Sequence, residues 1–378
     1  MKFMHISDLH LGKRVNEFSM LEDQKDILNK ILEIMDDERP QALLIAGDIY
    51  DKSIPSVEAI QLFDDFLCEI SGRGVQTFVI SGNHDSAERI SFGGRLMKES
   101  GVYVAPAYAR DTKPIVLEDE WGTANVYLLP FIKPVNVKRF FEEEQIESYT
   151  DAVRVCVKQM KVNTDERNVL VTHQFVTGAK RSESEDISVG GTDNVDASVF
   201  DEFDYVALGH IHGPQKIGRE TVRYCGTPLK YSFSEVHHKK SVTIVEMKEK
   251  GNIEVRERAL VPLRDWCEIK GSYMELTGKS YYEKLDKDSY MHITLTDEED
   301  IPEAVRKLQV IYPNLMKLDY DNQRTRGKAA FLEAAEAEER TPFDIFEELY
   351  EKQNNQEMNE EQKKLIHDLV EKIWEGGH

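Results

Sequence analysis

The stretch KFMHISDLH, residues 2–10, is an apolar run that ends in two residue types able to bind metal ions. Its apolar first half is typical of a short buried strand. Side chains two residues apart on an extended chain point to the same side, so Asp8 and His10 are expected to face one cation together. A single Asp-x-His pair is weak evidence for a metal site, and further ligands must come from elsewhere in the chain.

Four more apolar runs, at residues 43–46, 78–80, 169–172 and 205–209, end in the same way. They lead into Gly47-Asp48, Ser81-Gly82-Asn83-His84-Asp85, His173 and His210-Ile211-His212. Strand ends of an α/β sheet share one edge, so we expect the five ends to build one site. Carboxylate, imidazole and amide oxygen, with no thiolate, suit a divalent metal such as Mn²⁺, Fe²⁺ or Zn²⁺.

Composition describes a soluble protein of two or three domains, with 378 residues and a net charge of −22. The charge argues against an extended basic groove and against strong unaided binding to nucleic acid. Four scattered cysteines without CxxC spacing favour reduced thiols, and the sequence has neither a signal-peptide pattern nor a long apolar run. We therefore expect a cytoplasmic protein that does not enter a membrane.

The chain order predicts three domains. Helical patterns at about 19–37 and from Pro55 to Gly72 alternate with the first strands, which indicates a partly parallel sheet covered by helices. Shorter β-like runs between about 102 and 131 predict a second sheet. Composition changes near Pro262, and residues from about 265 to 318 read as a small α+β unit. The expected boundaries are 1–262, 263–330 and 331–378.

The last segment, residues 331–378, is strongly acidic and carries apolar residues at helical spacing only. Thr341-Pro342 offers a helix start, and Asn359 to Gln362 resembles a capping box. Two interpretations stay open: two helices packed on the body of the protein, or a helix pair that grips a helix of a partner.

Taken in order, the five motifs resemble those of the calcineurin-like metallophosphoesterases. The resemblance implies a four-layer α/β/β/α sandwich with seven metal ligands. One metal would be held by Asp8, His10, Asp48 and His212, and the other by Asp48, Asn83, His173 and His210. Two such ions about 3.5–4 Å apart activate water for in-line displacement at phosphorus.

The same resemblance assigns catalytic roles to the two residues that follow Asn83. It implies that His84 contacts the scissile phosphate and helps the leaving oxygen depart. It implies also that Asp85 orients His84 from behind, as a carboxylate that fixes an imidazole tautomer.

A closer resemblance, over essentially the whole chain, is to the bacterial SbcD family, the nuclease subunits of SbcCD complexes. It rests on residues 47–55, 226–235 and 341–346. It implies two divalent ions, Mn²⁺ first and Mg²⁺ second, and exonuclease and endonuclease cleavage of duplex DNA ends and hairpins in repair, recombination and replication. Residues 263–330 would be a capping domain that positions DNA.

The SbcD resemblance also implies partners. The helical tail would bind the SbcC ATPase in a heterotetramer, and helices after the second and third motifs would form a homodimer. One departure is Asp51, which stands near the place of a second active-site histidine in archaeal relatives. Two other functions compete: a small-molecule phosphodiesterase or phosphatase on the same metal site, and a non-catalytic scaffold for an ATPase.

Overall fold

The computed structural model describes residues 1–105, 107–110, 112–185, 193–326, 346–347, 350, 358–359 and 362–366. Packing divides the chain into two units. Unit 1 holds Met1–Glu268, Asp286–His292 and Tyr312–Lys317, and unit 2 holds Ile269–Leu285, Ile293–Ile311 and the described residues from Leu318 on. The predicted tail, residues 331–378, lies mostly outside the described residues, so its helices stay a prediction. Among the helices that are described, none is both long and apolar enough to cross a membrane.

The first sheet of unit 1 has six strands with a parallel centre of β1, β4, β5 and β6. Their order is β16 (Ile253–Ala259), β15 (Ser241–Met247), β1 (Lys2–Ile6), β4 (Ala42–Ala46), β5 (Gln76–Ile80) and β6 (Val102–Ala105). We expected residues 102–104 to open the second sheet, and that expectation was wrong. The chain between β5 and β6 forms a helical crossover that returns it parallel to β5, so β6 extends the first sheet.

The second sheet also has six strands, and its parallel centre is β8, β9, β12 and β14. Their order is β13 (Gln215–Ile217), β14 (Arg219–Tyr224), β12 (Tyr205–Gly209), β9 (Arg167–His173), β8 (Gly122–Leu129) and β7 (Ile115–Asp119). Two short pairs lie outside the sheets: β2 (Arg14–Val15) with β3 (Phe18–Ser19), and β10 (Phe175–Val176) with β11 (Asn194–Val195).

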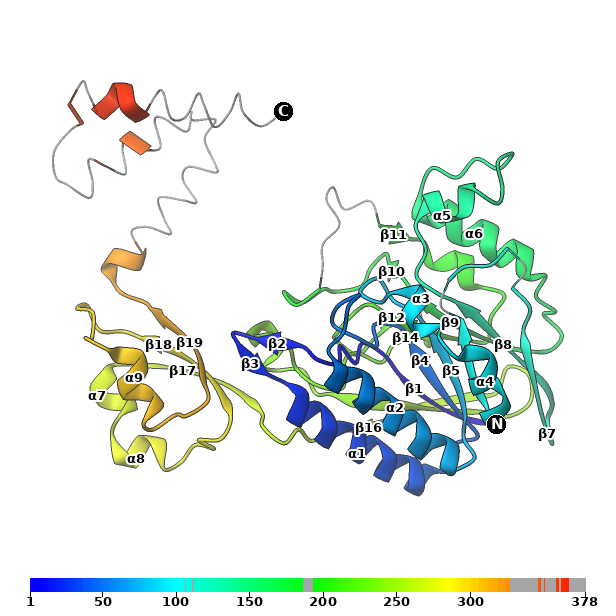
Figure 1. Cartoon of the computed structure of the whole chain (residues 1–378), viewed down its shortest axis with the longest axis horizontal. Helices are drawn as coiled ribbons and strands as arrows, with labels where there is room; N and C mark the ends of the chain where they lie inside the picture. Colours follow the sequence, from blue (N-terminus) through cyan, green and yellow to red (C-terminus); the bar gives the residue numbers. More distant parts are fainter. Residues whose placement is uncertain are drawn as a thin grey trace. The chain divides into compact units, whose positions relative to one another are not determined.

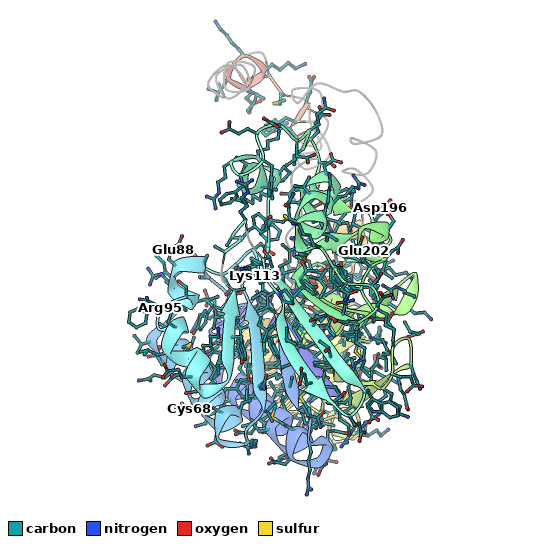
Figure 2. All side chains as sticks on the ribbon, turned by 90° about the vertical axis from the view of Figure 1, so that its right-hand side faces the viewer. Cys68, Glu88, Arg95, Lys113, Asp196 and Glu202 are labelled. Atoms are coloured by element: carbon teal, nitrogen blue, oxygen red, sulfur yellow. The ribbon has the colours of Figure 1, made fainter. Side chains whose placement is uncertain are left out.

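Helices cover the outer face of each sheet (Figure 1). The first sheet carries α1 (Leu21–Glu38) and α2 (Val57–Gly72), and its crossover to β6 holds α3 (Ala87–Ile90), α4 (Gly94–Met97) and η1 (Lys98–Ser100). The second sheet carries α5 (Pro134–Lys138), α6 (Tyr149–Met160) and η2 (Ala197–Phe200). Figure 2 shows both sheets edge-on, with Cys68 and Arg95 on one outer side and Asp196 and Glu202 on the other. The predicted four-layer sandwich is confirmed.

Alternation along the strands explains the three apolar cores of this unit. In β1, Phe3 points into the core between the two sheets, whereas Met4 points into the core under α1 and α2. In β9, Val171 joins the central core and Leu170 joins the core under α6. Because both faces of each central strand are buried, these strands read as continuous apolar runs in the sequence.

Unit 2 is a small α+β body. It contains α7 (Tyr273–Leu276), α8 (Lys279–Tyr282) and α9 (Ala304–Gln309). It also contains the carboxyl-terminal residues of each strand of a three-stranded sheet, whose strands are β17 (Trp266–Gly271), β18 (Tyr290–Leu295) and β19 (Leu315–Tyr320). Leu276, Ile293 and Leu308 are fully buried and form its apolar interior.

The five predicted strand ends belong to two sheets rather than one. β1, β4 and β5 come from the first sheet, and β9 and β12 from the second. They meet because His173, at the end of β9, places its Nδ1 2.8 Å from the carbonyl oxygen of Ala46, at the end of β4. The site therefore lies between the two sheets, at the carboxyl ends of their parallel strands.

Candidate metal centre

Four of the predicted ligands have left-handed backbone conformations. The φ angles are 54° at Asp8, 44° at His10, 48° at Asp48 and 105° at His210. Our argument from an extended chain was therefore wrong, since β1 ends at Ile6 and Asp8 and His10 lie on the turn that follows. Such backbone strain persists only where surrounding contacts impose it, and it is concentrated at functional sites.

Backbone hydrogen bonds between the first two strand ends hold these strained residues. The amide of Asp8 donates to Gly47 O at 3.0 Å, and the amide of His10 donates to Asp48 O at 3.0 Å. Gly47 has a φ of 88°, a conformation that costs glycine little. A Cβ at Gly209 would collide with Ala46 O, so this glycine is required for the close approach of β12 to β4.

The first group of donors comprises Asp8, His10 and His212, whose ligand atoms lie within 4.8 Å of one another. The Nε2 atoms of His10 and His212 are 3.2 Å apart. Asp48 Oδ2 lies 3.8 Å from His10 Nε2. All four residues are at most 2 % exposed, so their donors face a common buried space.

The second group of donors is built around Asn83. Its Oδ1 lies 3.0 Å from His173 Nε2 and 2.9 Å from His210 Nδ1. His173 Nε2 is also 3.4 Å from Asp48 Oδ2, so Asp48 borders both groups. Two donors each about 2.1 Å from one octahedral ion lie about 3 Å apart, so this spacing fits a shared ion.

The charges of the site also fit metal binding. Burial lowers the pKa of His210 to about 3 and lowers that of His10 well below its usual value, which keeps both imidazoles neutral with a free lone pair. Burial opposes protonation of His173 too, but the attraction of Asp48 raises its pKa to about 9. Asp48 thus attracts a proton to His173, and this imidazole would have to release it before it could bind an ion.

Burial and the like charge of Asp48 raise the pKa of Asp8 to about 6, although His173 opposes the shift. For Asp48 itself, burial works against ionisation, and the neighbouring histidines, His173 first, keep its pKa well below the usual range. Asp48 is therefore the carboxylate that stays ionised when the two acids compete. An ionised oxygen pair is what a ligand shared by two ions requires.

The orientation of His84 differs from our expectation. Its Nδ1 faces the carbonyl oxygen of Asp51 at 3.0 Å. The carboxylate of Asp85 instead accepts backbone N–H groups of Ile49, Tyr50 and Gly82 at 2.9–3.1 Å. The expectation that Asp85 holds the His84 imidazole was wrong, because its oxygens shape the loop that carries His84.

His84 Nε2 lies 3.9 Å from Asp48 Oδ2, and geometry alone would admit it to a group with His10 and Asp48. Its side chain is 20 % exposed, far more than those of His10 and His173. This position at the rim suits contact with a substrate.

Sequence reasoning missed the residues that support this site. Gln24, on α1, donates to His10 O at 2.7 Å and to Tyr231 Oη at 3.0 Å, and Tyr231 donates to Leu9 O at 2.6 Å. Glu185 accepts the backbone N–H of His212 at 2.6 Å. Only the segment 226–235 gave a signal, as a loop near the site, and it did not single out a side chain.

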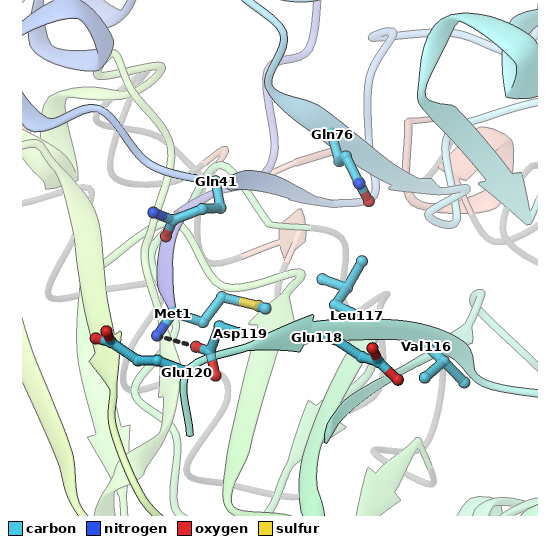
Figure 3. Close-up of a pocket in the computed structure, with 8 residues that line it drawn as sticks. All are labelled: Met1, Gln41, Gln76, Val116, Leu117, Glu118, Asp119 and Glu120. Carbon is cyan, nitrogen blue, oxygen red and sulfur yellow. Dashed lines mark ion pairs between the residues drawn. The ribbon is translucent and has the colours of Figure 1, made fainter. Parts of the chain in front are cut away.

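A cavity of about 710 Å³ lies elsewhere, at the amino ends of β1, β4 and β5 (Figure 3). Its lining residues are Met1, Gln41, Gln76, Val116, Leu117, Glu118, Asp119 and Glu120. It contains none of the candidate ligands and no imidazole. Size alone does not mark the site in this molecule, whereas the convergence of donor atoms does.

Comparison with known proteins agrees with this geometry. Residues 1–214 match the family model of the calcineurin-like phosphoesterases, and residues 260–354 match a model described as the type 5 capsule protein repressor C-terminal domain. A curated relative, the SbcD component of the nuclease SbcCD of Staphylococcus epidermidis, is 32% identical over 374 residues, which is 98% of each chain.

Two solved structures match the chain at much lower sequence identity. A dimetal phosphatase of Danio rerio is 12% identical, with a TM-score of 0.40 over 69% of this chain and 96% of its own. A protein of Thermus thermophilus is also 12% identical, with a TM-score of 0.38 over 68% of this chain and 98% of its own.

Proposed function

The chain belongs to the calcineurin-like phosphoesterases and, within them, to the SbcD family, and from this premise we propose that it is the metal-dependent nuclease subunit of an SbcCD-type complex. Its reaction is the hydrolysis of DNA phosphodiester bonds at duplex ends and hairpins, by exonuclease and endonuclease cleavage. The observation that carries this proposal is the convergence of seven donor residues in two groups that share Asp48.

The two donor groups support two divalent ions, with Mn²⁺ as the first choice and Mg²⁺ as the second. Mixed imidazole, carboxylate and amide donors suit Mn²⁺ better than the harder Mg²⁺. When bound, such a pair activates water and stabilises both oxygens of an in-line displacement at phosphorus. Asp48 would contribute to both ion sites, and the neutral imidazoles of His10 and His210 would bind without first losing a proton.

His84 is the proposed proton donor to the leaving oxygen. Its Nδ1 is held by Asp51 O, which leaves Nε2 to face the metal-binding space beside Asp48. Positioned general acids of this kind contribute about 10²–10⁴-fold to a rate. Asp85 would support this role indirectly, because its carboxylate accepts backbone N–H groups that fix the loop carrying His84.

DNA is the substrate that the whole chain suits best. Unit 2 and the segment after it, which a small phosphodiesterase would not need, support a capping domain over residues 263–330 that positions the duplex. The net charge of −22 predicts weak affinity for DNA from this chain alone. A partner subunit with basic surface supplies the rest of the binding energy.

The partner in this proposal is an SbcC-type ATPase, bound by the acidic tail, residues 331–378, in a heterotetramer. The relative from Staphylococcus epidermidis is named as one subunit of the SbcCD nuclease and matches over nearly its whole length, which supports this assembly. The setting would be the cytoplasm, and the pathways DNA repair, recombination and replication.

A homodimer through unit 1 is also part of the proposal. Large apolar side chains are exposed on α2 and the loop before it, and again around α3 and α4. They are Ile54, Val57, Ile60, Phe92 and Leu96, with exposed fractions between 43% and 84%. Several exposed apolar side chains on neighbouring turns of these segments could form the kind of apolar patch that is typical of protein interfaces. These two segments follow the second and third motifs, where the family resemblance places the dimer contact.

The test is digestion of end-labelled duplex DNA with Mn²⁺ or Mg²⁺, run beside bis-p-nitrophenyl phosphate as a simple diester. We expect cleavage of both substrates, and loss of both in Asp48→Ala. Hydrolysis of the simple diester with DNA intact, even after the ATPase partner is added, would favour a small-molecule phosphodiesterase. Loss of neither activity in Asp48→Ala would reject the metal centre.

A further inference from the structure

A chain of polar groups, partly buried at Ser184 and buried at Glu235 and Lys240, leads away from the Nδ1 side of His212. Ser184 Oγ lies 2.6 Å from His212 Nδ1 and also contacts Glu235 Oε1. Glu235 is fully buried, and its other oxygen contacts the ammonium of Lys240. None of the five strand-end motifs contains these three residues. Ser184 lies in a loop, Glu235 at the end of η3 (Phe233–Glu235) and Lys240 just before β15.

Proton counting along this chain fixes the form of the His212 imidazole. The Glu235 carboxylate, paired with Lys240, has no proton to give, and it lies closer to Ser184 Oγ than Ser182 Oγ does at 3.0 Å. The single hydroxyl proton of Ser184 is therefore donated to Glu235. Ser184 Oγ can then only accept at its contact with Nδ1, so Nδ1 carries the imidazole proton. The lone pair is therefore on Nε2, the atom that faces His10 Nε2 at 3.2 Å.

Lys240 connects the same chain to the backbone of His212. Its Nζ donates to His212 O at 2.9 Å and to Thr227 Oγ1 at 2.6 Å, besides its contact with Glu235. Lys240 is 5 % exposed, so all three contacts are made away from water. A buried ion pair of this kind is costly to assemble, and fixing the geometry of a residue beside it is one established use.

We propose that Ser184 and Glu235 are positioning residues that set the tautomer and ring orientation of His212, and thereby the affinity of the metal site formed by Asp8, His10, Asp48 and His212. This inference rests on the proposed function, because it concerns an ion in that site. Partners behind metal-bound histidines typically contribute about 10–100-fold to metal affinity. The other metal site, formed with Asn83, His173 and His210, has no contact with Ser184 among the described residues and keeps its affinity.

The test is calorimetric titration of the metal-free full chain with Mn²⁺. The wild type shows two binding events. In Ser184→Ala one event weakens by about 10–100-fold while the other is unchanged. Ser184→Thr, which keeps the hydroxyl, restores the wild-type titration. A spin resonance spectrum taken at two equivalents of Mn²⁺ shows coupled ions in the wild type and isolated ions in Ser184→Ala.

Ser234→Ala is the matched control. Ser234 Oγ accepts the backbone N–H of Glu183, so its loss loosens the same loop without touching the imidazole. Equal weakening in Ser234→Ala would mean that loop position alone matters, and unchanged titration in Ser184→Ala would also overturn the inference. If the wild type itself bound no pair of ions, the proposed function would fail instead.

Discussion

Buried charged groups occur at both ends of the two-sheet sandwich, but their partners differ between the two ends. At the amino end, Arg167 is 2 % exposed and forms an ion pair with Asp119. The carboxylate of Asp119 also forms an ion pair with the N-terminal ammonium of Met1, at 2.7 Å (Figure 3). At the carboxyl end, Asp48 lies within ion-pair distance of three imidazoles, those of His10, His84 and His173.

The difference separates a structural cluster from a chemical one. Charges that satisfy each other hold the sheets in place and leave nothing for a ligand. Carboxylate, imidazole and amide donors that converge on one buried space can instead hold a metal ion, which would replace the proton that Asp48 attracts to His173. Variants at the two ends should therefore fail in different ways: activity is lost at one end, and stability at the other.

The largest effect is expected at the rim of the carboxyl end. His84→Ala should lower kcat for DNA cleavage by about 10²–10⁴-fold, because it removes the proposed proton donor to the leaving oxygen. Both Mn²⁺ ions should still bind, since the backbone N–H of His84 keeps its 2.9 Å hydrogen bond to Asp48 Oδ1 in the variant. Cleavage rates and a metal titration of the same preparation measure the two outcomes. Full activity in His84→Ala would remove His84 from the mechanism.

The next effect belongs to the amino end. Arg167→Met leaves Asp119 partly buried without its guanidinium partner and should lower the free energy of unfolding by about 3–5 kcal/mol. Mn²⁺ affinity should not change. Arg73→Met is the control, since Arg73 pairs with Asp36 and Glu69 on the surface and its loss should cost about 0–1 kcal/mol. Equal unfolding energies for the two variants, by urea denaturation, would contradict the distinction.

A smaller effect should depend on pH. The guanidinium of Arg256, with that of Arg258, lowers the pKa of Glu38 to about 2, against 4.5 for the free side chain. A carboxylate with a lowered pKa stabilises the fold above about pH 4.5, and this contribution is lost as the pH falls towards 2. Because both arginines are about one-third exposed, we expect Glu38→Gln to cost about 1–2 kcal/mol at pH 7.

That cost should shrink when unfolding is measured at pH 3.5, where the wild-type carboxylate has lost part of its advantage. A cost independent of pH would mean that packing around Glu38, rather than its charge, stabilises α1 against the first sheet.

Local pattern in the sequence predicts the buried strands and the candidate ligands at their ends, whereas the four layers were expected from the family resemblance. Apolar runs ending in Asp8, Asp48, Asn83, His173 and His210 are readable one strand at a time. The left-handed turns at Asp8 and His10 are not, since hydrogen bonds to Gly47 and Asp48, on another strand end, impose them. Likewise β6 joins the first sheet through a crossover that no spacing of apolar residues reveals.

The residues that support the site through hydrogen bonds also could not be predicted from local pattern. The partner of His84 is a backbone carbonyl, which every residue carries, so composition gives no sign of Asp51 in that role. Ser184 and Glu235 meet across 51 positions of sequence, beside His212. Such contacts depend on tertiary structure, and only the assembled fold brings them together.

The most direct test of the account is anomalous diffraction from crystals of the full chain soaked in Mn²⁺. The account predicts two peaks about 3.5–4 Å apart, one among Asp8, His10, Asp48 and His212 and one among Asp48, Asn83, His173 and His210. A single peak, or peaks away from these residues, would contradict a two-metal centre built from the five strand ends.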